Sequence, residues 1–168
     1  ALDGMGRNDE ALDSHLVALA YAPEGDAYHD LTRNLARSTH RAARYVETVR
    51  AMAARARDAG TSAGPLYLRL GAALEEDLND AAGAAEAYAE AEAVLDGDGL
   101  LTALRALDRL YAQTGDAAGH ARVLRRLIDA APDGAVDSAW RLASIELAQA
   151  DERRPVVARL VAGREAVA

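Results

Sequence analysis

Residues 67–96 read YLRLGAALEEDLNDAAGAAEAYAEAEAVLD, and they set a pattern that recurs along the chain. Alanine, leucine and glutamate dominate this stretch, and all three have high intrinsic helix propensity. Asn79 and Asp80 interrupt it near the middle, where they favour a turn. The stretch therefore predicts two helices, and because the connection between them is short, these helices should run antiparallel as a hairpin.

The rest of the chain repeats this alternation of helical segments and short breaks. Strand-forming residues never alternate over a long stretch, so the pattern predicts an all-α fold. Gly4-Met5-Gly6 is expected to form a turn before the first helix, and Pro155 is expected in the first turn of the last helix, where its missing N–H costs nothing. The sequence predicts nine helices, at residues 8–21, 26–37, 40–58, 63–77, 80–95, 99–113, 117–131, 136–149 and 154–166.

The ends of the helices recur at a regular interval, which indicates a repeat protein. Pro23 and Asp96, each at the end of a second helix, lie 73 residues apart, and Pro132 follows Asp96 by 36 residues. These steps correspond to a period of about 36 residues. The predicted organisation is a single array over 1–168, with a partial repeat at 1–23 and repeats at 24–60, 61–97, 98–133 and 134–168.

The first unit contains little more than the second half of a repeat, so Ala1 and Leu2 are expected to be the tail of a preceding helix. We therefore expect the chain to be a fragment of a longer array. The terminal helices should then expose an apolar face, through which two copies could form a homodimer; a frayed terminus is the alternative.

Within these repeats, the residues resemble tetratricopeptide repeats, whose unit is a helix-turn-helix of about 34 residues. The matching positions are Gly6, Ala11, Ala18 and Pro23, then Tyr67, Leu70, Gly71, Leu74, Ala84, Tyr88 and Ala91, then Leu107, Tyr111, Gly115, Leu124 and Pro132. The sequence departs from the family at Asp108 and His120, where small residues are usual. Segments 26–58 and 136–166 match mainly in spacing. The resemblance implies antiparallel hairpins stacked as a right-handed α-solenoid.

The pattern of small and large residues also predicts the core. Small residues let two helices approach closely, and a large residue on the facing helix fills the remaining space. Because one hairpin cannot bury both of its faces, neighbouring hairpins must stack. The predicted core residues are Leu70, Leu74, Tyr88, Leu107, Tyr111 and Leu124.

The composition gives little support for catalysis or for metal binding. The chain has no cysteine, and its four histidines occur without the spacing of a metal site. We therefore expect no catalytic residue, no cofactor and no metal. A net charge of -8 argues against a general nucleic-acid binder, and no apolar run is long enough to span a membrane. No signal-peptide pattern opens the chain, which favours the cytoplasm, but the chain does not begin with Met and its compartment stays open.

The resemblance to tetratricopeptide repeats implies a binding groove lined by the first helix of each hairpin. Carried over position by position, the groove residues are His29, Arg33, Arg37, Leu68, Arg105, Arg109, Gln113 and Trp140. Arginine forks bind carboxylates well, so the expected partner is a protein or peptide, with an acidic peptide as the specific hypothesis. The alternatives are that the arginines form a solvated face and that Trp140 is a core residue.

The predicted function is a non-catalytic protein-interaction scaffold. Two alternatives remain open at this point. The chain could be a structural segment that stacks with itself or with further repeats, or it could be the regulatory arm of a larger enzyme. Fold alone does not choose between these functions.

Overall fold

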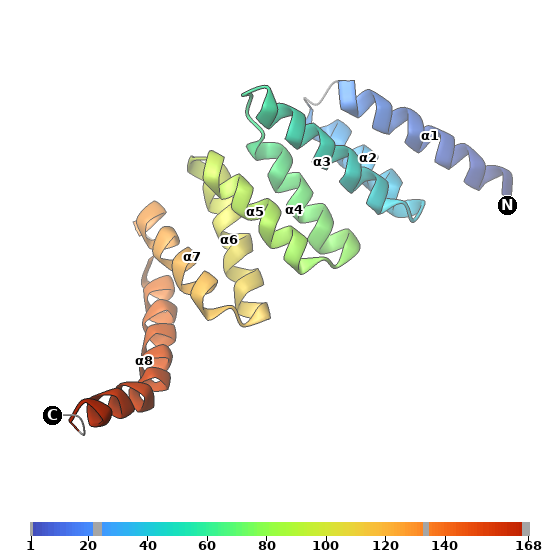
Figure 1. Ribbon diagram of the computed structural model, residues 1–168. Helices are drawn as coiled ribbons and strands as arrows, with labels where there is room; N and C mark the ends of the chain where they lie inside the picture. Colours follow the sequence, from blue (N-terminus) through green and yellow to red (C-terminus); the bar gives the residue numbers. More distant parts are fainter. Residues whose placement is uncertain (1, 22–24, 133–134, 166–168) are drawn as a thin grey trace. The chain divides into compact units, whose positions relative to one another are not determined.

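The computed structural model describes residues 2–21, 25–132 and 135–165, and Figure 1 shows it as a series of helices. Within these residues there are eight α-helices and no strand, so the prediction of an all-α fold is confirmed. The helices are α1 (Leu2–Tyr21), α2 (Asp26–Ser38), α3 (Ala42–Asp58), α4 (Gly64–Leu78), α5 (Ala81–Val94), α6 (Gly97–Thr114), α7 (Ala117–Ala130) and α8 (Ala135–Glu165). The chain divides into two compact units, Ala1–Ala106 and Leu107–Ala168.

The prediction of nine helices is wrong at the C-terminal end, where α8 covers both of the last two predicted helices. Pro155 therefore lies inside a helix rather than in the first turn of a new one. A proline within a helix removes one backbone hydrogen bond and commonly bends the helix, but it does not have to end it. Figure 1 shows that the ribbon of α8 changes direction in its C-terminal part. The fourth predicted hairpin is thus a single bent helix.

The first predicted boundary is also wrong, because α1 begins at Leu2 and includes Gly4-Met5-Gly6. Leu2 therefore belongs to α1 and is not the tail of a separate helix. A glycine inside a helix costs about 1 kcal/mol relative to alanine, which packing can offset. The buried side chains of Leu12, Leu16 and Leu19 provide this packing along one face of α1.

The hairpin of α4 and α5 shows how local chemistry forms the repeat. Asn79 ends α4 in the left-handed conformation, with φ of 53°, a conformation that asparagine tolerates. Asp80 then caps α5, because its Oδ1 accepts a hydrogen bond from the Gly83 N–H at 2.9 Å. Gly71 in α4 faces the ring of Tyr88 in α5, and a Cβ at Gly71 would lie 2.8 Å from the Tyr88 Cε1. A large residue thus fills the space that glycine leaves open.

Successive hairpins of the first unit stack through ion pairs between equivalent helices. Arg69 of α4 pairs with Asp26 of α2, and Arg33 of α2 pairs with Asp77 of α4. Between the second helices of neighbouring hairpins, Arg44 of α3 pairs with Asp13 of α1. Since α4 also packs on α3, the packing of neighbouring helices is consistent with a helical repeat.

The predicted core is largely confirmed. Leu70, Leu74, Tyr88, Leu107 and Leu124 are all buried. Tyr111 is only half-buried, so this prediction is wrong. The position facing its ring on α7 is Gly119, which has no side chain to cover it; a Cβ there would lie 3.2 Å from the Tyr111 Cδ1.

The two departures from the tetratricopeptide pattern, Asp108 and His120, contact each other in the second unit. The Asp108 Oδ1 and the His120 Nε2 lie 2.7 Å apart, which joins α6 to α7. Arg141 of α8 donates from its Nη1 to both carboxylate oxygens of Asp108, at 2.9 Å each. A polar cluster therefore connects three helices at a position where the family pattern has small residues.

Replacing Asp108 with asparagine should reduce the free energy of unfolding by about 1–2 kcal/mol. The hydrogen bonds at this position would then be made to a neutral amide instead of a charged, mostly buried carboxylate. Urea unfolding followed by circular dichroism measures this loss. The matched control is Glu146→Gln, which removes the charge of the exposed Arg125–Glu146 pair between α7 and α8. An exposed pair contributes roughly 0–1 kcal/mol, so an equal effect of the two variants would contradict the prediction.

Candidate binding groove

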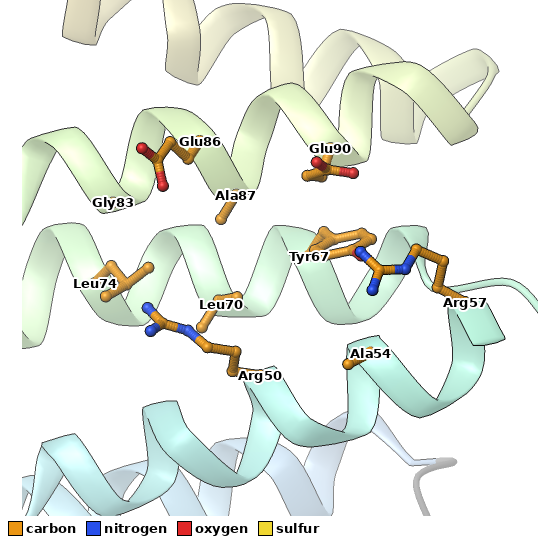
Figure 2. A pocket seen from close by; sticks show the side chains of 10 residues that line it. All are labelled: Arg50, Ala54, Arg57, Tyr67, Leu70, Leu74, Gly83, Glu86, Ala87 and Glu90. Atoms are coloured by element: carbon orange, nitrogen blue, oxygen red, sulfur yellow. The ribbon is translucent and has the colours of Figure 1, made fainter.

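A groove opens on the first unit between α3 and α5, above α4, with a volume of about 430 Å³ (Figure 2). We call it the α3–α5 groove. A volume of this size falls in the range of sites that hold small ligands or a few side chains. Its lining residues are Arg50, Ala54 and Arg57 of α3, Tyr67, Leu70 and Leu74 of α4, and Gly83, Glu86, Ala87 and Glu90 of α5.

The floor of the α3–α5 groove is formed by buried, mainly apolar side chains of α4. Tyr67, Leu70 and Leu74 recur three and four residues apart on α4, so they lie on one face of that helix. All three are buried against α3 and α5. On either side of them, the short side chains of Ala54 and Ala87 leave the groove open. The groove is therefore open to a segment lying along it, although its floor offers little apolar area for new burial.

The two walls of the groove carry opposite charges. Arg50 and Arg57 project from α3, and Glu86 and Glu90 project from α5 on the other side of the floor (Figure 2). Among the described residues, no ion pair or hydrogen bond joins these two walls; the one charged contact is between Arg57 and its neighbour Asp58, at 3.5 Å. Two basic and two acidic groups thus face each other across the groove without neutralising one another.

The neighbouring groove between α1 and α3 differs in this respect. It is larger, at about 690 Å³, and its lining includes Asp13, Val17, Ala51 and Arg44. Here an ion pair between Asp13 and Arg44 crosses from one helix to the other. The charges of these two groups are already satisfied within the protein, so they have less to offer a ligand.

The structure places Arg33, the first arginine predicted to bind a partner, in an internal ion-pair cluster. Its Nε donates to the Asp77 Oδ2 at 2.6 Å, and its Nη2 donates to the Glu76 Oε2 and to the Ala72 carbonyl, each at 3.0 Å. Burial lowers the pKa of Arg33, but the hydrogen bond and charge of Asp77, together with Glu76, outweigh burial and raise the pKa overall. Arg33 is therefore occupied in joining α2 to α4.

The other predicted residues of α2 and α4 are also engaged or covered. Arg37 is half-exposed but pairs with Asp77 at 3.3 Å, so the structure brings Arg33 and Arg37 together on one carboxylate. His29 is 1% exposed, and its Nδ1 lies 3.2 Å from the Tyr45 hydroxyl, so it lies in the core rather than on an open face. Leu68 is half-buried.

The predicted residues of α6 and α8 are exposed. Arg105 belongs to the first unit, whereas Arg109 and Gln113 belong to the second. Trp140 is 72% exposed on α8, so its interpretation as a core residue is wrong. An exposed tryptophan is a common anchor in protein interfaces, which keeps the surface interpretation of Trp140 as a prediction.

Sequence reasoning missed the α3–α5 groove. The residues of its walls occur at helical spacing, because Arg50 and Arg57 are seven positions apart and Glu86 and Glu90 are four positions apart. That spacing indicates that each pair shares one helix face. It does not show that the two faces oppose each other, because this depends on how α3 and α5 pack on α4.

The part of the chain that the structure describes holds neither a cluster of metal ligands nor a membrane-spanning helix. No group of three or more histidine, cysteine, aspartate or glutamate side chains is arranged to hold a metal ion there. None of the described helices combines the length and apolar character needed to cross a membrane. In comparisons with protein-family models, curated proteins and solved structures, nothing matched this chain.

Proposed function

We propose that this chain is a non-catalytic protein-interaction scaffold that holds a segment of a partner protein in the α3–α5 groove. In this proposal, tetratricopeptide-like hairpins stack as a right-handed solenoid. The observation that carries the proposal is the pair of oppositely charged walls, which face each other without an ion pair across an open, apolar floor. Charged groups left uncompensated at a preformed site attract a ligand with complementary charges.

The proposal moves the binding site from the first helices to the second helices of the hairpins. Arg33 and Arg37, which were predicted to bind an acidic peptide, already share Asp77. A partner carboxylate would have to compete with this internal pair. In contrast, Arg50 has no charged partner among the described residues.

The groove supports binding better than catalysis. A hydrolytic or transfer mechanism usually needs a nucleophile beside a base, or an acid and a base aimed at one reacting atom. The lining residues include no serine, cysteine or histidine, and the two glutamates lie on the same wall. Recognition would therefore be an equilibrium process. Because exposed ion pairs contribute roughly 0–1 kcal/mol each, we expect weak and reversible binding.

Filling the groove without changing its charge tests this proposal. Ala54→Tyr should abolish capture of a specific partner from a lysate of the source cell, because the new ring would occupy the groove. The matched control is Ala51→Tyr, which places the same ring on the same helix but in the neighbouring α1–α3 groove. Loss with both variants, or with neither, would sink the placement of the site in the α3–α5 groove.

Self-assembly is a second candidate, and it rests on exposed apolar side chains of the terminal helices. These residues are Val17 and Tyr21 on α1 and Val136, Trp140 and Leu147 on α8. Exposed apolar residues that share a helix face can mark an interface. Sedimentation at increasing concentrations would support this function if wild-type chains associated and a Trp140→Ala variant did not.

A further inference from the structure

We infer that the α3–α5 groove recognises an amphipathic helix that carries acidic residues along one edge and basic residues along the other. The inference rests on the proposed function and specifies the partner. Arg50 and Arg57 would receive the acidic edge, while Glu86 and Glu90 would receive the basic edge. The apolar strip between these edges would lie over the floor formed by Tyr67, Leu70 and Leu74.

The spacing of the wall charges favours a helix over an extended segment. Seven residues of a helix rise about 10.5 Å, so Arg50 and Arg57 match acidic residues seven apart on another helix. Glu86 and Glu90 match basic residues four apart, about 6 Å along the axis. In an extended segment, successive side chains on one edge lie about 6.6 Å apart, and the next one along lies about 13 Å away. Neither distance matches the spacing of about 10.5 Å that Arg50 and Arg57 require.

The two walls together exclude simpler ligands. A wholly acidic segment, such as a nucleic acid backbone, would meet Glu86 and Glu90, and a wholly basic segment would meet Arg50 and Arg57. Like charges brought together in this way oppose binding. Only a segment with both signs, arranged on opposite edges, satisfies the two walls at once. The groove therefore selects a partner by the arrangement of its charges rather than by its net charge.

Synthetic peptides test the charge pattern directly. The first probe is an alanine-based helical peptide with a leucine strip, two glutamates seven apart on one edge and two lysines four apart on the other. Two control peptides carry glutamate on both edges or lysine on both edges. In fluorescence anisotropy at low salt, the mixed peptide should bind about tenfold more tightly than either control, since two favourable pairs replace two repulsive ones.

Variants of the protein provide the complementary test. Reversing one wall with Arg50→Glu and Arg57→Glu should weaken binding of the mixed peptide about tenfold. Adding Glu86→Arg and Glu90→Arg interchanges the charges of the two walls, so the matching peptide now carries two lysines seven apart on one edge and two glutamates four apart on the other. We expect the fourfold variant to bind this charge-exchanged peptide about as tightly as the original chain binds the mixed peptide. Circular dichroism checks that both variants keep their helical content, because all four side chains are exposed.

Each remaining outcome has a defined meaning. Equal binding of the three peptides, or failure of the fourfold variant to bind the charge-exchanged peptide, would overturn the inference. Equal binding of a mixed peptide with a central proline would show that the occupant need not be helical and would also overturn it. Self-association of the chain that disappears in Ala54→Tyr would assign the groove to a second copy. If Ala54→Tyr abolishes capture of a natural partner while the peptides fail, the scaffold function stands and the helical occupant does not.

Discussion

Replacing Asp77 with alanine is expected to reduce the free energy of unfolding by about 3 kcal/mol, the lower end of the cost of breaking a buried ion pair, because Glu76 still pairs with Arg33. The Asp77 side chain is 1% exposed and receives hydrogen bonds from the Nε and the Nη2 of Arg33. Removing it would leave a mostly buried guanidinium, 19% exposed, without its strongest partner. Urea unfolding of the full chain, followed by circular dichroism, measures the change.

Glu76 offers a matched control for this experiment. It pairs with the same guanidinium at 3.0 Å, but its side chain is 57% exposed. Glu76→Ala should therefore cost less than about 1 kcal/mol, as expected for an exposed ion pair. If Asp77→Ala were as mild as Glu76→Ala, the α2–α4 ion pair would not be a major contributor to stability.

The second large effect is expected at the α4–α5 contact. Tyr88→Ala should cost about 3–5 kcal/mol, because it removes a buried ring and leaves a cavity that Gly71 cannot fill. Tyr88→Phe keeps the ring and should cost less than about 1 kcal/mol, since its hydroxyl donates to Glu75 at a long 3.4 Å. The same urea unfolding experiment compares the two variants.

A double variant tests whether Gly71 and Tyr88 share one packing site. Gly71→Leu alone should destabilise by about 1–3 kcal/mol, because its side chain would collide with the Tyr88 ring. In the Tyr88→Ala background, the leucine would instead fill the cavity. The combined variant should therefore be more stable than Tyr88→Ala alone. Simple addition of the two losses would show that the two residues do not share one packing site.

Features that depend on nearby residues were predicted from the sequence better than features that depend on packing. Leu70, Leu74 and Leu124 were predicted as core residues from the local pattern of small and large residues, and they are buried. The boundaries failed at Gly4 and at Pro155 because both residue types disfavour a helix without forbidding it. Whether the helix continues then depends on packing, which the sequence pattern does not report.

The candidate site was less predictable than the fold. Arg33 looked available because its neighbours in sequence do not include its partner; Asp77 lies 44 residues further on. Arg50 and Glu86 received no attention because they lie on second helices, and the family resemblance pointed to the first ones. In the structure, Arg33 and Arg37 of α2 pair with Asp77, whereas the charged side chains of α3 and α5 line an open groove.

The sequence by itself determined the all-helical fold, the hairpin at Asn79 and Asp80, and most of the core, since propensity, capping and periodicity act over a few residues. Only the tertiary structure decided which charges neutralise each other and which stay exposed and unpaired. An ion pair depends on the distance between its charged groups, and helix packing sets that distance for residues far apart in the chain. Arg33 is therefore satisfied by Asp77, while Arg50 faces Glu86 across an open groove.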